Sequence, residues 1–125
     1  MATIMTVDDE PMILSLITTI LNEHGHCIIT AGSAAEALTK FRECPQKIDL
    51  LISDISMPGM DGIALAGKLQ SSDPDLKVLL MSGGCNRNQV PASYEFVPKP
   101  FVLTDMVSKV DRLCGPPTVR VFAAA

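Results

Sequence analysis

The chain has 125 residues, the length of one domain, and 47% of them are hydrophobic, so it can build a core and is not a disordered chain. Fourteen acidic residues against ten basic ones give a formal charge of −4, which argues against nucleic-acid binding. Because the sequence shows neither a signal-peptide pattern nor a membrane-length apolar stretch, we expect a soluble, cytoplasmic protein with no nucleic-acid or membrane partner.

In chain order, the first half predicts two strand–helix units. A β-branched strand over 3–7 precedes a helix that begins at Pro11, a residue suited to the first helical position, and ends before Gly25. A second strand over 27–30 precedes a helix that begins with a capping box at 33–36.

The second half continues this alternation. Its predicted elements are a strand over 48–52, a helix over 63–69, strands over 77–81 and 94–97, and a helix over 103–113. Between the last two strands, segment 83–93 contains two glycines, two asparagines and a proline. These residues disfavour a helix interior, so we expect at most one or two turns there.

Strands that alternate with helices predict an α/β fold. Right-handed βαβ units give a parallel sheet with helices on both faces, although the spacing alone does not give the strand order. The continuous apolar runs of the central strands indicate burial on both sides. We expect one domain over 1–115 and a short tail over 116–125.

Polar residues gather where the predicted strands end. Asp8 and Asp9 follow the first strand, Asp54 the third, Ser82 the fourth and Lys99 the fifth. Each alone also fits a structural role, as a helix cap, turn residue or solvated charge. Ligands of open parallel sheets bind at the carboxyl ends of the strands, so five such residues at one edge indicate a functional site.

Four motifs at these strand ends resemble the receiver domain of two-component response regulators. They are VDDEP at 7–11, SDISMPGMDG at 53–62, MSG at 81–83 and VPKPF at 97–101. The resemblance extends over about 3–113. It implies a doubly wound, five-stranded sheet of the flavodoxin or CheY type, with strand order 2-1-3-4-5. The fourth crossover helix of that fold is expected to be short or degenerate here.

The resemblance implies that Asp54 accepts a phosphoryl group. The donor would be the phosphohistidine of a sensor histidine kinase or of a histidine phosphotransfer protein. The domain would catalyse its own phosphorylation and autodephosphorylation at Asp54 without being a conventional enzyme. A carboxylate is ionised at neutral pH, so it can act as the nucleophile without a general base.

The resemblance also implies a magnesium site. Asp9 and Asp54 would bind Mg²⁺ directly, Asp8 would bind it through a water, and the backbone carbonyl of Ser56 would be a further ligand. These are the hard oxygen ligands that Mg²⁺ prefers. Repulsion among the clustered carboxylates is expected to raise their pKa values.

The remaining implied roles concern the phosphorylated state. Ser82 would hydrogen-bond the phosphoryl oxygens and Lys99 would pair with them. Ser82 and Phe96 would be the switch residues. The bond between Lys99 and Pro100 is expected to be cis.

Two other functions remain open from the sequence. A small Mg²⁺-dependent phosphatase of the haloacid dehalogenase type also forms an aspartyl phosphate, but it carries D-x-D after its first strand, whereas Asp8 and Asp9 are adjacent. The third interpretation is a pseudo-receiver that folds without being phosphorylated, and the complete set of site residues argues against it. We expect a receiver without an output domain, stand-alone or excised from a longer chain, and a monomer, because the short 83–93 segment removes a dimerisation surface of the family.

The histidines and cysteines are assigned to structure. His24 and His26 lie at the end of the first helix and are expected at the surface, away from the site. Four cysteines, at 27, 44, 85 and 114, lie far apart without a C-x-x-C pair, so we expect mostly buried, reduced thiols.

Overall fold

Five parallel strands form one sheet in the order β2-β1-β3-β4-β5 in the computed structural model, as predicted. The structure describes residues 2–84 and 87–114, so Cys85 and the predicted tail over 116–125 lie outside the described residues. The elements are β1 Thr3–Val7, α1 Pro11–Glu23, β2 Cys27–Ala31, α2 Ala34–Glu43, β3 Leu50–Asp54, α3 Gly62–Ser72, β4 Lys77–Ser82, a 3₁₀ turn Arg87–Gln89, β5 Glu95–Pro98 and α4 Leu103–Cys114.

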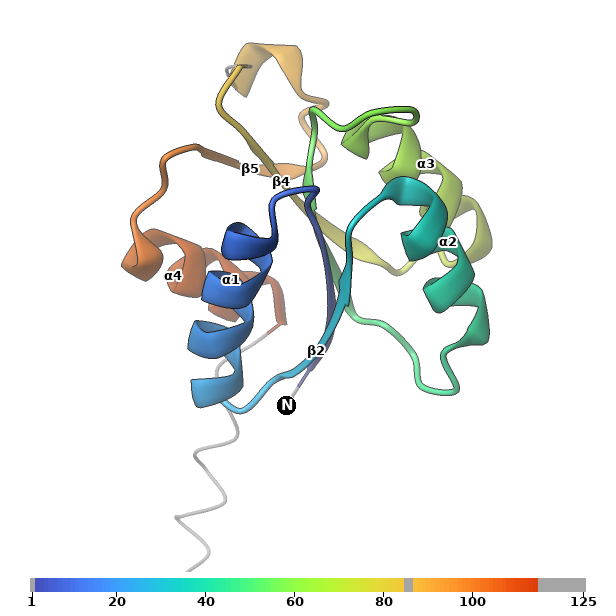
Figure 1. The fold of residues 1–125 in the computed structure, drawn as a ribbon, viewed down its shortest axis with the longest axis horizontal. Coiled ribbons are helices and arrows are strands. Elements are labelled where there is room, and N and C mark those ends of the chain that lie inside the picture. The colour runs from blue at the N-terminus through green and yellow to red at the C-terminus, as the bar shows by residue number, and fades with distance from the viewer. Residues whose placement is uncertain (1, 85–86, 115–125) are drawn as a thin grey trace, which may run out of the picture.

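Helices cover both faces of the sheet (Figure 1). Alternate residues of the central strands enter two separate cores. Leu51 and Leu80 pack in the core under α2 and α3, whereas Leu50, Ile52 and Leu79 pack in the core under α1 and α4. This alternation explains why the central strands read as continuous apolar runs.

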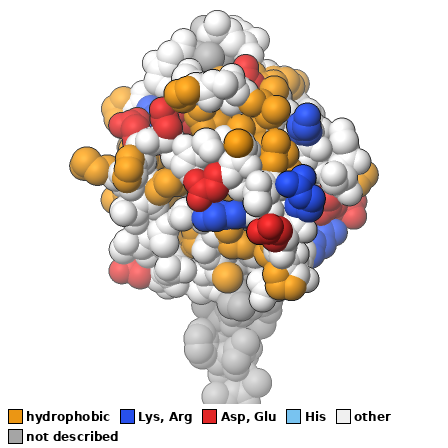
Figure 2. Space-filling view, turned by 45° about the vertical axis from the view of Figure 1, so that its right-hand side comes forward, with side chains coloured by type: hydrophobic (Ala, Val, Ile, Leu, Met, Phe, Trp, Pro, Cys, Tyr) orange, Lys and Arg blue, Asp and Glu red, His pale blue; other side chains and the backbone are white. Residues whose placement is uncertain are grey.

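The outer surface over α2 and α3 is mixed in character. Figure 2 shows hydrophobic side chains gathered in the upper part of this view, with acidic and basic side chains around and below them. On α2, Glu36 and Lys40 lie one turn apart and form an ion pair at 2.9 Å. None of the described helices is long and apolar enough to cross a membrane.

The helix ends follow the predicted signals. Gly25 follows α1 with a φ of +85°, a conformation that glycine adopts without a Cβ penalty. Ser33 caps α2 by accepting a hydrogen bond from the Glu36 N–H at 3.1 Å. The Glu36 carboxylate accepts a hydrogen bond from the backbone N–H of Gly32. In a capping box the donor would be the N–H of the cap residue itself, Ser33.

The third strand begins two residues later than predicted. Asp49 instead anchors the start of β1, because its N–H donates to the Thr3 carbonyl at 2.8 Å and its Oδ2 accepts from the Thr3 N–H at 2.9 Å. The strand therefore runs to Asp54, and β4 likewise runs to Ser82. Asp54 and Ser82 are thereby the last residues of their strands, and both are buried.

The connection between β4 and β5 lacks a regular α-helix in its described part, as predicted. It forms a single 3₁₀ turn, Arg87–Gln89, and the following Val90 is buried in the core. Tyr94 fixes the end of the connection by donating a hydrogen bond from its hydroxyl to the Gln70 side chain at 3.1 Å. In the described part of this connection, the one helical element is therefore a single short turn.

The predicted exposure is wrong for His26, which was expected at the surface, and for Cys27, which was expected to be buried. His26 is buried, because its ring lies where β1 and β2 begin and its Nδ1 accepts a hydrogen bond from the Ala2 N–H at 3.2 Å. The described cysteines are all free, as predicted, but Cys27 is exposed rather than buried.

His26 is expected to make stability depend on pH. Burial lowers its pKa below the ordinary 6.5, Asp111 opposes this shift, and the positive amino terminus and His24 add to it. The unfolded chain then binds a proton that the folded chain does not, so stability falls as pH decreases through 6.5. In urea unfolding between pH 7.5 and pH 5, we expect His26→Gln to lose this dependence and His24→Gln to keep it. Equal pH dependence in all three proteins would refute the assignment.

Candidate functional site

The residues predicted from the strand ends meet at the carboxyl edge of the sheet. Asp8 directly follows β1, Asp54 ends β3, and Lys99 directly follows β5. Each of Asp8, Asp9 and Asp54 offers a carboxylate oxygen, and these oxygens lie within 4.8 Å of one another. Asp8 and Asp54 are buried, whereas Asp9 is exposed.

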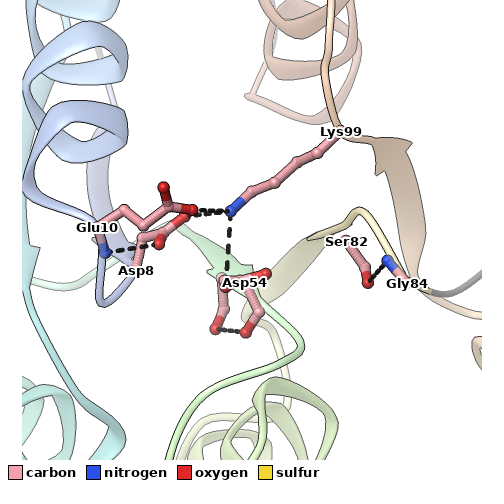
Figure 3. A network of polar contacts seen from close by, with 7 residues as sticks. Asp8, Glu10, Asp54, Ser82, Gly84 and Lys99 are labelled. Carbon is pink, nitrogen blue, oxygen red and sulfur yellow. Dashed lines mark hydrogen bonds and ion pairs between the residues drawn. The ribbon is translucent and has the colours of Figure 1, made fainter.

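The ammonium group of Lys99 lies between the carboxylates of Asp8 and Asp54 (Figure 3). Its Nζ donates to Asp8 Oδ2 at 2.8 Å and lies 3.5 Å from Asp54 Oδ2 and 3.6 Å from Glu10 Oε1. The other oxygen of Asp8 accepts the Glu10 N–H at 2.9 Å. Both oxygens of Asp8 are thus engaged by protein donors, which fixes its orientation.

The cluster shifts the pKa values of two groups. Burial raises the pKa of Asp54, the charge of Asp8 raises it further, and Lys99 only partly offsets both. Burial alone would lower the pKa of Lys99, but its hydrogen bond to Asp8 and the surrounding carboxylates outweigh burial, so the pKa is raised. The pKa of Asp54 is thus raised in the expected direction, but burial contributes more to the shift than repulsion from Asp8.

The raised pKa predicts that Asp54 destabilises the fold at neutral pH. Between the ordinary value of 3.8 and its raised value, the folded chain binds more protons than the unfolded chain, so stability falls as pH rises. We expect Asp54→Asn to raise the melting temperature at pH 7. The difference should vanish below pH 3.8, where the carboxyl is protonated in both states. A lower melting temperature at pH 7 would contradict the prediction.

The acidic cluster fits a hard divalent cation. Three carboxylates supply oxygen ligands, and two of them are buried at the end of the sheet. Ser56 lies in the loop two residues after Asp54, and its carbonyl remains a predicted ligand. The residues at this edge are therefore suited to hold Mg²⁺.

The predicted switch residues lie on β4 and β5. Ser82 is buried, its Oγ accepts the Gly84 N–H at 3.0 Å, and its carbonyl accepts the Lys99 N–H at 2.9 Å. Phe96 pairs in register with Leu80 and is 8% exposed. The bond between Lys99 and Pro100 is cis, as predicted.

Sequence reasoning missed two residues of this site. The sequence indicates Glu10 only as part of the VDDEP motif, whereas in the structure its carboxylate lies 3.6 Å from the Lys99 ammonium. Gly62 was given no role, yet a Cβ at this position would lie 2.2 Å from the backbone oxygen of Asp54. The detectable signal was a glycine directly after Asp61, which caps α3 by accepting the Ala64 N–H at 2.8 Å.

Comparison with known proteins places the chain among signalling domains. The sequence profile described as "Response regulator receiver domain" matches residues 4–111. The response regulator receiver protein CpdR of Brucella abortus is 29% identical over 90% of this chain and 97% of its own length. The sensor kinase CckA of the same organism is 32% identical over 90% of this chain.

Several curated relatives are much longer than the matched region. The chain spans 12% of CckA, 24% of NtrC from Azospirillum brasilense and 49% of TcrX from Mycobacterium tuberculosis. The similarity to these proteins therefore concerns one domain of each.

Solved structures give the same assignment. The response regulator TrrA of Thermotoga maritima, solved in complex with Mg(2+)-BeF, superposes with a TM-score of 0.80 and 36% identity, covering 90% of this chain and 99% of TrrA. A complex of TrrA with the histidine kinase ThkA matches with a TM-score of 0.78 and 36% identity, covering 90% of this chain and 98% of the matched one. The fold, the motifs at its strand ends and these comparisons agree: the chain belongs to the response regulator receiver domain family of two-component signalling.

Proposed function

We propose that this chain receives a phosphoryl group on Asp54 in a Mg²⁺-dependent reaction. The observation that carries the proposal is the Lys99 ammonium, which lies 2.8 Å from Asp8 and 3.5 Å from Asp54 beside the acidic cluster. The domain performing this reaction would cover residues 1–115.

The chemistry needs little covalent help from the protein. An Asp54 carboxylate oxygen attacks the phosphorus of a phosphohistidine, its O–P bond forms, and the P–N bond to the donor imidazole breaks. Lys99 would pair with the incoming phosphoryl oxygens, and Ser82 would donate its hydroxyl to them. Bound Mg²⁺, held by Asp9 and Asp54 with Asp8 acting through a water and the Ser56 carbonyl as a further ligand, would neutralise phosphoryl charge.

A small phosphodonor tests this proposal. Treatment with acetyl phosphate and Mg²⁺ should add one acid-stable, base-labile phosphoryl group, seen by mass spectrometry of the intact protein. EDTA should prevent the addition, and the modified protein should slowly return to its original mass. Labelling in EDTA would refute the magnesium site, absence of labelling would indicate a pseudo-receiver, and sustained hydrolysis of many phosphate esters would indicate a phosphatase.

The proposed phosphodonor is a histidine kinase or a histidine phosphotransfer protein. The TrrA–ThkA complex supports this partner class for a structural neighbour. In this chain, the first turns of α1 adjoin the acidic cluster and expose Met12 (83%) and Leu16 (43%), which are four residues apart and share a helix face. Met12→Asp should therefore slow phosphorylation by a kinase at least tenfold while leaving phosphorylation by acetyl phosphate unchanged. Equal slowing with both donors would place Met12 in the chemistry rather than in recognition.

We further propose that phosphorylation leaves the protein monomeric. A single described 3₁₀ turn, Arg87–Gln89, stands where a helix would contribute to a dimer face between β4 and β5. Sedimentation with Mg²⁺ and beryllofluoride, a phosphoryl mimic, should give the mass of one chain. A monomer-to-dimer shift that substitutions in 87–93 abolish would contradict this proposal.

A further inference from the structure

Glu10 occupies a helix-capping position without capping the helix. It is the N-cap residue of α1, but its side chain accepts no capping hydrogen bond. Its carboxylate instead approaches Lys99, with Oε1 3.6 Å from Nζ, and its backbone N–H donates to Asp8. Figure 3 shows Asp8 and Glu10 side by side, both directed at the Lys99 ammonium. One residue thus orients Asp8 through its backbone and contacts Lys99 through its side chain.

The three ion pairs that Lys99 makes with described residues differ in one respect. Asp8 and Asp54 belong to the acidic cluster suited to a cation, whereas Glu10 does not. Asp8 Oδ2 already binds the Lys99 ammonium and its Oδ1 the Glu10 N–H, so a cation at the cluster competes with Lys99 for carboxylate oxygens. Glu10 lies outside the cluster, so a cation bound there leaves the Glu10 carboxylate available to Lys99.

We infer that Glu10 is a positioning residue that keeps the Lys99 ammonium beside Asp54 when a divalent cation occupies the acidic cluster. The inference rests on the proposed function. The side chain of Lys99 is 14% exposed and that of Glu10 is 65% exposed, so Glu10 contacts the lysine from the solvent side. An exposed side chain can change rotamer and keep this contact if a bound cation shifts the ammonium. The side chain of Asp8 is fully buried and has no such freedom to adjust.

The first test observes Lys99 directly, by the ¹⁵N–¹H NMR signal of its ammonium, assigned with Lys99→Arg. Without a divalent cation, wild type and Glu10→Gln should both show an ordered ammonium, because Asp8 and Asp54 hold it. With saturating Mg²⁺, the signal should persist in wild type and broaden or disappear in Glu10→Gln. Glu23→Gln, the same change in charge at the far end of α1, should behave as wild type. A signal that persists equally in Glu10→Gln with Mg²⁺ would overturn the inference.

The second test measures phosphorylation by acetyl phosphate at saturating Mg²⁺. Glu10→Gln should be about two- to fivefold slower than wild type, the range over which an exposed ion pair contributes. Glu10→Asp, which keeps the charge but shortens the reach, should also be slower, and Glu23→Gln should match wild type. An unchanged rate in Glu10→Gln would refute the positioning role. If wild type itself binds no Mg²⁺ and accepts no phosphoryl group, the proposed function fails instead.

Discussion

Asp54→Asn is expected to abolish phosphorylation. Asparagine keeps the size of the side chain and one carbonyl oxygen but removes the carboxylate nucleophile, and no described carboxylate offers the same position at the end of β3. Mass spectrometry after acetyl phosphate and Mg²⁺ treatment should show the phosphorylated species in wild type and none in the variant.

The matched control for this variant is Asp75→Asn. Asp75 precedes β4 at the opposite end of the sheet, and its exposed side chain pairs only loosely with Lys47, at 3.6 Å. Because it is remote from the acidic cluster, the control should be labelled like wild type. Labelling that survives in Asp54→Asn would move the acceptor to another residue and refute the assigned site.

Gly62→Ala is expected to cause the largest loss of stability among the variants considered. A Cβ at position 62 would lie 2.2 Å from the backbone oxygen of Asp54, closer than real Cβ contacts allow. It would also lie 3.0 Å from the Cα of Ile55, which is a tight contact. Neither neighbour is a flexible side chain, so the start of α3 or the end of β3 must shift. Overpacking of this kind costs about 3 kcal/mol, which urea unfolding measures.

Gly67→Ala provides the internal control within the same helix. Gly67 lies mid-helix in α3 and its added Cβ would meet nothing within 4 Å. Alanine has the higher helix propensity, so this variant should be more stable by about 1 kcal/mol. Equal and small effects at both positions would show that β3 and α3 are not packed as closely as described. A shifted Asp54 backbone should also slow phosphorylation in Gly62→Ala.

Much of the fold could be predicted because the signals are local or repeat with the period of the element. The apolar runs of β1 and β4, the proline at the start of α1 and the glycine after it each report a nearby backbone requirement. The start of β3 was misplaced because Asp49 stands within an apolar run in the sequence, whereas in the fold it hydrogen-bonds Thr3, which is 46 positions away. The strand order came from the family resemblance and not from the spacing.

The site residues at the strand ends could be named, but their supporting contacts could not. In the sequence, Glu10 is only an acidic residue before the predicted helix, and the ion pair with Lys99 is visible only in the fold. The burial of His26 likewise depends on the start of β1, 24 positions away. Such contacts join residues whose separation carries no periodic signal, so sequence patterns do not detect them.

The ion pair between Asp8 and Lys99 has a consequence for the order in which the protein matures. The two residues are separated by 91 positions, so this contact closes only after nearly the whole domain has been synthesised and β5 has joined the sheet edge. Until then, the carboxylates of Asp8 and Asp54 lack their internal cation. A nascent or partly unfolded chain therefore lacks the ion pair between Asp8 and Lys99. If Asp54 accepts a phosphoryl group as proposed, that reaction should require the completely folded domain.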